Sequence, residues 1–177
     1  MPIPVGRLYQ KKHLGNGTVA TIEDNTVNTV QAGADINFGV GISLKPDANG
    51  KMVAVTANSA PIFGIAIKRN RINGDDYDAI PNDHFLEGEV FGALRKGGIS
   101  VPITEDVNRY ENATVDANGN FKVAQAGEQV VGVFLTDGNA LTAGDDDSGT
   151  AIVQVNLTDM VAPSPSTRPT TPAAPSN

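Results

Sequence analysis

The clearest feature of the chain is a pattern of apolar and polar positions that occurs twice. Residues 47–67 read DANGKMVAVTANSAPIFGIAI, and residues 116–135 read DANGNFKVAQAGEQVVGVFL. Each copy opens with Asp-Ala-Asn-Gly, continues into a short apolar run, crosses a polar loop and ends in an apolar run around one glycine. Asn-Gly supplies the positive φ values of a tight hairpin turn, and β-branched and aromatic residues favour strands. The pattern therefore predicts two related antiparallel hairpin halves.

Further strands are predicted on either side of the two copies. Between Ile36 and Leu44 every second residue is apolar, which predicts one half-buried strand leading into the first turn. Looser alternation in residues 19–30 predicts a strand that begins the body. The sequence AIVQVNL, residues 151–157, predicts the last strand.

The stretch FLEGEVFGALRKGGISVPI, residues 85–103, lies between the two copies. We expect two strands here, with the glycine pair 97–98 turning the chain between them. Glu87 and Glu89 would share one face of the first strand, because side chains alternate along a strand. Pro102 indicates a sheet edge or a strand end in the second.

The two ends of the chain differ from the body in composition. Residues 1–18 carry two prolines and three glycines and predict an extended N-terminal arm. Residues 161–177 carry five prolines among Ser, Thr and Ala, which predicts a polyproline-like or disordered tail. We predict that the residues between them, 19–160, form one domain. The sequence thus predicts an all-β protein, a single antiparallel β-barrel or β-sandwich with two related halves, an arm and a tail.

Composition agrees with one β domain and removes some classes of site. A chain of 177 residues suits a single domain with a real core, and 19 Gly with 11 Pro favour turns over helix. With 5% aromatic residues and no tryptophan, we expect a core of Val, Ile, Ala and Leu. The absence of cysteine excludes disulfides and thiolate metal sites. We expect a soluble protein without an export signal or membrane span, because no long apolar window occurs.

Charge is distributed unevenly. The net charge of −7 argues against a general nucleic-acid binder, which needs a basic face. Arg7, Lys11 and Lys12 precede the first acidic residue, Glu23, so the side chains of residues 1–22 sum to +3 and the rest to −10 (−7 minus +3). Two interpretations remain open: a basic arm that steers toward an acidic partner, or three solvated charges at a terminus.

Candidate catalytic residues are few. His13 and His84 are the two histidines, and neither adjoins a nucleophile motif such as Gly-x-Ser-x-Gly. Glu87 and Glu89 have the residue type of a glycosidase pair, but two acidic neighbours on one strand face are common on solvated sheets. The sequence predicts no catalytic residue.

Candidate ion and cofactor sites are weak as well. No phosphate-binding loop ends in Gly-Lys-Ser/Thr, and zinc has no plausible ligand set. Two acidic runs offer oxygen ligands for calcium, yet neither has the spacing of an EF-hand, and we expect solvated loops with no metal and no cofactor. These runs are Asp75, Asp76 and Asp78, and Asp145, Asp146 and Asp147.

The order of these motifs resembles that of the structural cement, or capsid decoration, proteins of tailed bacteriophages. The resemblance runs from about Thr18 to Leu157 and rests on AGADINFGVGISL, the first DANG hairpin with IFGIAI, EGEVFGALRKGGISVPI, the second DANG hairpin with VVGVFL, and AIVQVNL. The polar residues 68–84 are longer than that pattern suggests. The resemblance implies a protein on the outer surface of the capsid, a homotrimer, the major capsid protein as partner, and no catalytic residues.

We therefore predict a virion structural protein that bridges neighbouring major capsid proteins and stabilises the expanded shell, without nucleic-acid or membrane partners. Arg7, Tyr9, Lys11 and Lys12 of the arm are the predicted capsid contacts. A carbohydrate-binding or adhesin-type β module is the alternative, although three tyrosines and no tryptophan offer few aromatic platforms. A hydrolase is the third class, disfavoured by the missing nucleophile and base. Fold class alone separates none of these.

Overall fold

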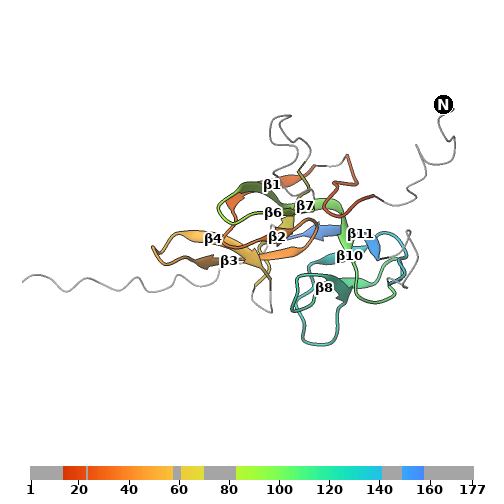
Figure 1. The fold of residues 1–177 in the computed structure, drawn as a ribbon. Helices are drawn as coiled ribbons and strands as arrows, with labels where there is room; N and C mark the ends of the chain where they lie inside the picture. The colour runs from red at the N-terminus through yellow and green to blue at the C-terminus, as the bar shows by residue number, and fades with distance from the viewer. Residues whose placement is uncertain (1–13, 23, 58–60, 70–82, 141–148, 158–177) are drawn as a thin grey trace, which may run out of the picture.

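The computed structural model describes residues 14–22, 24–57, 61–69, 83–140 and 149–157. Within them the chain forms strands joined by turns and loops, and no helix (Figure 1). The strands build one large curled antiparallel sheet and a small sheet of two strands. The prediction of an all-β protein is therefore confirmed.

Most of the strands are short, in keeping with the many glycine-containing turns. In chain order they are β1 (Thr26–Gln31), β2 (Ile36–Asn37), β3 (Gly41–Pro46), β4 (Met52–Thr56), β5 (Gly64–Ala66), β6 (His84–Phe85), β7 (Val90–Pro102), β8 (Asn112–Val115), β9 (Phe121–Val123), β10 (Gly132–Phe134) and β11 (Thr150–Asn156).

The large sheet consists of two five-stranded units with the same plan. In the first unit, hairpin β3–β4 pairs through β3 with β5, β5 pairs with β7, and β7 pairs with β1. In the second unit, hairpin β8–β9 pairs through β8 with β10, β10 pairs with β11, and β11 pairs with β7. The repeat in the sequence is thus a repeat of strand pairing.

Each unit curls until its first and last strands meet at one parallel bridge. Ala32, directly after β1, meets Ala54 of β4, and Ile103, directly after β7, meets Phe121 of β9. In both units the following residue donates its backbone N–H to the carbonyl of the same partner, at 2.8 and 3.0 Å respectively. The two related halves are therefore two curled units of one sheet.

Strand β7 belongs to both units. Its first part pairs with β1 and β5, and residues 96–102 pair with β11. The predicted turn at residues 97–98 is wrong, because the chain continues through both glycines as one strand of 13 residues. A Cβ on Gly97, whose φ is 130°, would collide with the Asn25 side chain, and one on Gly98 would collide with Thr21. The two glycines therefore do not form a turn. They let residues 21–25 pass close to β7.

The predicted continuous strand from Ile36 to Leu44 is also wrong. It is divided into β2 and β3 by a turn at Gly39, whose φ is 79°. A Cβ at Gly39 would lie 2.7 Å from the backbone nitrogen of Gly17, so only glycine lets these two segments meet. The alternation correctly indicated burial: the buried members of the set are Ile36, Phe38, Val40 and Ile42.

Buried apolar side chains form two clusters, and β5 and β7 contribute to both. Ala66 and Ala93 belong to the cluster of the first unit, whereas their neighbours Ile65 and Leu94 belong to the cluster centred on the second unit. Successive side chains of a strand point to opposite faces, so these two strands are buried on both sides. Burying an Ile or Leu side chain contributes about 1.5–3 kcal/mol, so this double burial helps to hold the two units together.

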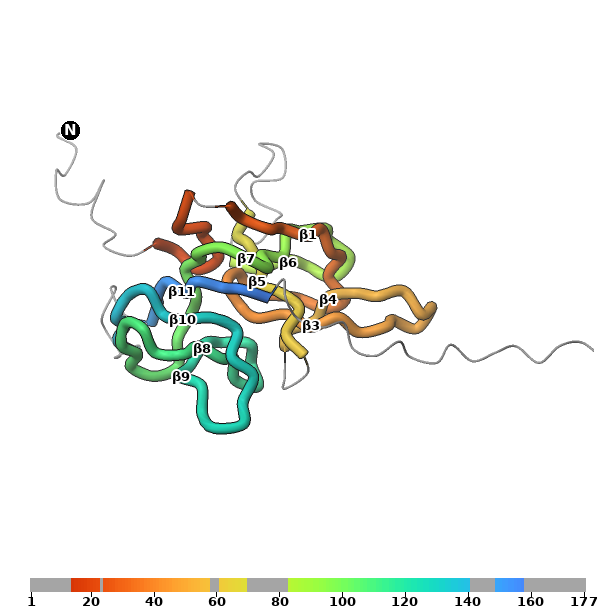
Figure 2. The backbone as a smooth tube through the Cα atoms, turned by 180° about the vertical axis from the view of Figure 1, so that it is seen from behind, coloured from red at the N-terminus to blue at the C-terminus, as the bar shows by residue number. Residues whose placement is uncertain are grey.

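The two DANG turns have the same internal hydrogen bonds. Asp47 Oδ1 accepts the backbone N–H groups two and four residues later at 2.8 Å, and Asp116 Oδ1 accepts the corresponding groups at 2.8 and 2.9 Å. Gly50 and Gly119 close the turns with φ values of 78° and 77°. The surroundings differ, because the first hairpin projects from the body (Figure 2), while the carbonyl of Gly119 accepts the N–H of Gly41 at 2.8 Å.

This difference predicts unequal costs for one substitution in two identical turns. A Cβ at Gly50 meets no atom within 4 Å, whereas one at Gly119 would lie 2.7 Å from Thr56 Cγ2 and 2.9 Å from Gly41 O. Gly50→Ala should lower the free energy of unfolding by about 1–2 kcal/mol through the positive φ alone. Gly119→Ala should cost a further 1–3 kcal/mol or so from overpacking. Urea denaturation of both variants measures this, and equal losses would show that the second turn does not pack as described.

Candidate interaction surfaces

The predicted capsid contacts of the arm lie outside the described residues. Arg7, Tyr9, Lys11 and Lys12 all fall within residues 1–13, so their role stays a prediction. The described part of the arm begins at Leu14, whose carbonyl accepts the hydroxyl of Ser100 at 2.8 Å. The structure therefore shows where the arm joins the body.

Residues 17–20 run antiparallel to the second half of β7. Three backbone hydrogen bonds of 2.7–2.9 Å join them to Gly98 and Ser100. Val19 forms an isolated β-bridge with Ile99 between these bonds. The end of the arm thus covers the edge of β7 opposite β11.

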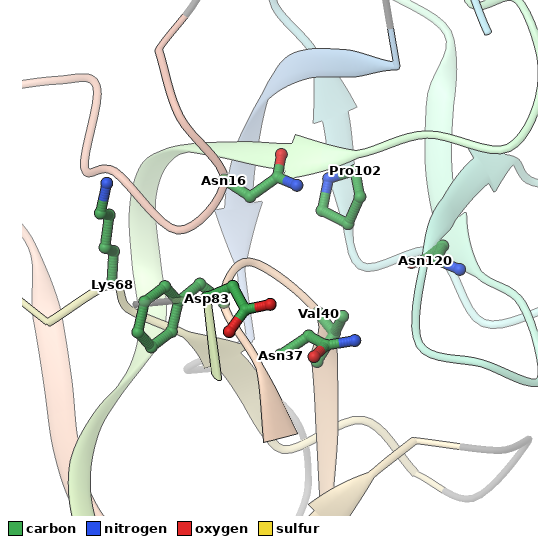
Figure 3. A pocket seen from close by; sticks show the side chains of 8 residues that line it. Asn16, Asn37, Val40, Lys68, Asp83, Pro102 and Asn120 are labelled. Carbon is green, nitrogen blue, oxygen red and sulfur yellow. The ribbon is translucent and has the colours of Figure 1, made fainter. Parts of the chain in front are cut away.

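A polar cleft of about 380 Å³ lies where the two units meet (Figure 3). Asn37 of β2 and Val40, directly before β3, form one part of its wall, and Pro102 and Asn120 of the second unit form another. Asn16 lies beside Pro102 in Figure 3, and its side-chain oxygen is buried and accepts no hydrogen bond from the described residues. The remaining lining residues are Phe38, Lys68 and Asp83. Amides and opposite charges suit a small polar group better than an apolar ligand.

His84, the candidate base among the described residues, adjoins Asp83, which lines this cleft. It lies in β6, opposite Asn37 of β2, and its Nδ1 is 2.7 Å from Asp83 Oδ1. This hydrogen bond lowers the pKa of the Asp83 carboxyl, which is itself largely exposed. The arrangement is a surface hydrogen-bonded pair, whose contribution to stability is small.

Glu87 and Glu89 do not share a strand face, so that prediction is wrong. Both lie in the turn that precedes β7. Glu89 accepts Arg69 Nη2 at 2.7 and 2.6 Å through its two oxygens and the backbone N–H of Leu86 at 2.7 Å. The backbone N–H of Glu87 donates to Asp35 Oδ1 at 3.1 Å. The Glu89 carboxylate thus has a structural role, because it joins the Arg69 guanidinium to the turn before β7.

The two acidic runs proposed as calcium ligands also fall outside the described residues. Among the residues that are described, no three His, Cys, Asp or Glu side chains are grouped so as to hold a metal ion. The same residues contain no helix long and apolar enough to cross a membrane.

A second recess, here called the β1 groove, opens between β1 and β4 and was not indicated by the sequence. Its volume is about 410 Å³. Met52 and Val90 at its rim are 52% and 65% exposed, while Val30, Leu44 and Phe63 reach down to the core of the first unit. The other lining residues are Asn28, Thr29, Gln31 and Lys51.

The β1 groove exists because β1 and β4 diverge away from their bridge. They meet at Ala32 and Ala54, and the side chains of Gln31 and Lys51 hydrogen-bond across the gap. An exposed strand edge beside apolar side chains is a surface that proteins normally cover. The groove is therefore the strongest candidate interaction surface in the described part of the chain.

Comparison with known proteins gives two findings. A family profile described as "Structural cement protein (E217 gp24/Pam3 gp6)" matches residues 8–158. Among solved structures, the head fiber gp8.5 N base of bacteriophage phi29 is similar, with a TM-score of 0.50 and 9% sequence identity over 76% of this chain and 96% of that chain. At this identity the likeness concerns the fold alone. No curated protein sequence matches the chain.

The Asp83–His84 pair predicts a specific pH response. The lowered pKa of Asp83 means that the pair stabilises the fold above the ordinary carboxyl pKa and loses this contribution as pH falls through the lowered value. In His84→Phe the pKa of Asp83 should rise toward its ordinary value, as measured by NMR titration of the side-chain carboxyl. Glu128, whose pKa is lowered by its hydrogen bond to Lys122, serves as the internal control and should not move. An unchanged Asp83 pKa in the variant would contradict the pair.

Proposed function

The chain belongs to the family of phage structural cement proteins, and from this premise we propose that it binds the outside of a bacteriophage capsid and bridges neighbouring major capsid proteins. Membership makes it a phage virion structural protein and implies association with capsid proteins. The observation that carries the proposal is the extent of the match, since residues 8–158 include both five-stranded units and the end of the arm.

The proposed role is structural and non-enzymatic. The described site geometry agrees with it, because His84 and Glu89 are engaged in surface and turn contacts. The acidic body, at −10 without residues 1–22, would be repelled by packaged DNA and by other acidic surfaces, so we propose neither nucleic acid nor membrane as partner. Its charge also keeps the free protein soluble before assembly.

The arm is the proposed contact with the shell. Residues 17–20 are fastened to β7, so the residues before them start from a fixed place on the second unit. Arg7, Lys11 and Lys12 carry the positive charge of the arm, and Tyr9 adds an aromatic side chain among them. This basic segment would bind an acidic surface of the major capsid protein.

Several copies acting together would give the stabilisation that a shell needs. We propose the homotrimer expected from the resemblance, in which three arms bind neighbouring capsid subunits and gain avidity from their connection. Preferential binding to the expanded shell stabilises that state by about 2.7 kcal/mol per site at a hundredfold excess over Kd. The protein would then act as a ligand for one conformation of the capsid.

Cosedimentation with expanded capsids of the corresponding phage tests the proposal. We expect saturation at a fixed ratio to the capsid subunits, together with a higher melting temperature of the shell. No binding to expanded shells would refute the capsid role and make a glycan-binding screen the next experiment.

A matched pair of charge variants tests the arm. Lys11→Glu/Lys12→Glu should weaken binding roughly tenfold or more, because like charges then face each other at the contact. Lys45→Glu/Lys96→Glu changes the net charge by the same amount at two exposed positions of the body and should have much less effect. Equal losses in both variants would remove the arm from the contact and leave only a general charge effect.

A further inference from the structure

The two units differ at the outer edge of the strand that closes each of them, β1 in the first unit and the second half of β7 in the second. This edge is covered in the second unit only, among the described residues. In the second unit, the edge of β7 opposite β11 is covered by residues 17–20, which bond to the backbones of Gly98 and Ser100. These two residues lie five and three positions before Ile103, where the unit closes on β9. The end of the arm therefore fills the position beside the closing strand.

In the first unit, β1 takes the place of that part of β7. Ala32, which forms the bridge to Ala54, corresponds to Ile103 of the second unit. The residues five and three positions before Ala32 are Val27 and Thr29, so these two correspond to Gly98 and Ser100. The N–H of Ala32 points toward β7 and donates to Glu89 O at 2.8 Å, whereas the next N–H donates to Ala54 O on the other side. Backbone N–H and C=O groups alternate between the two edges of a strand. Those of Val27 and Thr29 therefore point toward the β1 groove.

This edge carries no strand partner among the described residues except at the Ala32–Ala54 bridge. Val27 is 48% exposed, whereas Gly98 and Ser100 at the equivalent positions are buried. A row of backbone groups beside an apolar recess is the arrangement that binds an extended peptide by strand addition. The covered edge in the second unit shows how such a strand lies.

We propose that the β1 groove receives residues 2–6 of a second copy of this chain, added antiparallel to β1. Their sequence is Pro-Ile-Pro-Val-Gly. In an added strand, Ile3 and Val5 would direct their N–H groups toward β1 and stand opposite residues such as Thr29, with their side chains on the Thr29 face. The rings of Pro2 and Pro4 would lie on the Val30 face, toward the apolar groove. Pro2 and Pro4 would then face the other edge, where the missing N–H groups cost no hydrogen bond with β1.

The direction of the described arm favours a second copy over the same chain. From Ala20 back to Leu14, the segment moves along β7 from Gly98 toward Ser100 and the cleft beside Pro102. β1 lies against the opposite part of β7, residues 90–96. The described part of the arm thus ends away from its own groove, and a chain of 13 further residues can span up to about 45 Å.

Such a contact is heterologous, because each copy donates one arm and offers one groove. Contacts of this kind generate closed rings when the rotation between copies closes. Arg7, Tyr9, Lys11 and Lys12 would lie between the docked strand and the anchored residues 17–20, so they stay available to a capsid surface. The inference concerns assembly of free protein and does not rest on capsid binding.

Cross-linking tests the contact directly, because the natural chain has no cysteine. A tagged Val5→Cys copy is mixed with an untagged Thr29→Cys copy, without capsids, and oxidised. We expect a disulfide-linked pair of the two, since cross-strand neighbours meet the Cα–Cα distance of a disulfide. Ile3→Cys and Arg7→Cys repeat the experiment at adjacent registers. Ala126→Cys, exposed in a turn of the second unit, replaces Thr29→Cys as the control and should not cross-link.

Every alternative occupant gives a different result. A Val5→Cys/Thr29→Cys double variant that cross-links within single chains, while the mixed copies do not, would assign the groove to the protein's own arm and overturn the proposal. Absence of any cross-link at the three registers would also overturn it. If added shells protect Thr29→Cys from maleimide labelling and no arm cross-links to it, the occupant is the capsid, which overturns the proposal. Cosedimentation of the unmodified chain reports on capsid binding independently.

A proline variant gives a second measurement that does not depend on register. Thr29→Pro removes an N–H on the groove side of β1 and leaves the N–H groups that face β7. It should weaken self-association by roughly tenfold in sedimentation equilibrium, with the melting temperature of the dissociated protein little changed. Met52→Lys, at the exposed rim, should act in the same direction through the apolar contact. Unchanged self-association in both variants would contradict strand addition at this edge.

Discussion

The structure depends on one strand that serves two units at once. β7 closes the first curled unit with its first half and opens the second with its last half. It can do so because Gly97 and Gly98 let the chain continue where any side chain would strike Asn25 or Thr21. Side chains on both faces of its first half are buried, so separating the units would expose two cores rather than one. A single body follows from this sharing, although the sequence repeats.

Duplication of the unit does not make the two halves equivalent. In the second unit the carbonyl of Gly119 bonds to the first unit, and residues 17–20 cover the edge of β7. In the first unit the equivalent hairpin tip projects from the body, and the equivalent edge, at β1, opens into the β1 groove. Within the described residues, internal repetition thus identifies an edge that no strand covers, by comparison with its covered counterpart. Exposed apolar area alone would have been a weaker argument.

The features that the sequence predicted correctly are local ones. Both DANG turns and the strands around Gly64 and Gly132 follow from residues that are neighbours in the chain, and the same hydrogen bonds form in both copies. The errors concern glycines whose role is set by distant segments. The pair at 97–98 accommodates residues 21–25, and Gly39 accommodates Gly17. The β1 groove was missed for the same reason, since its walls come from β1, β3, β4 and β7, far apart in sequence.

A strand edge without a partner is a liability for any protein in solution. Free edges template aggregation unless charge, proline or a covering segment blocks them. Here β1 is six residues long, Lys51 lies at the rim of the groove, and the chain carries a net charge of −7. These features discourage nonspecific stacking but leave the backbone of Val27 and Thr29 accessible to a strand with the right alternation. The proposed strand addition needs that combination, because the edge must be selective before assembly and occupied after it.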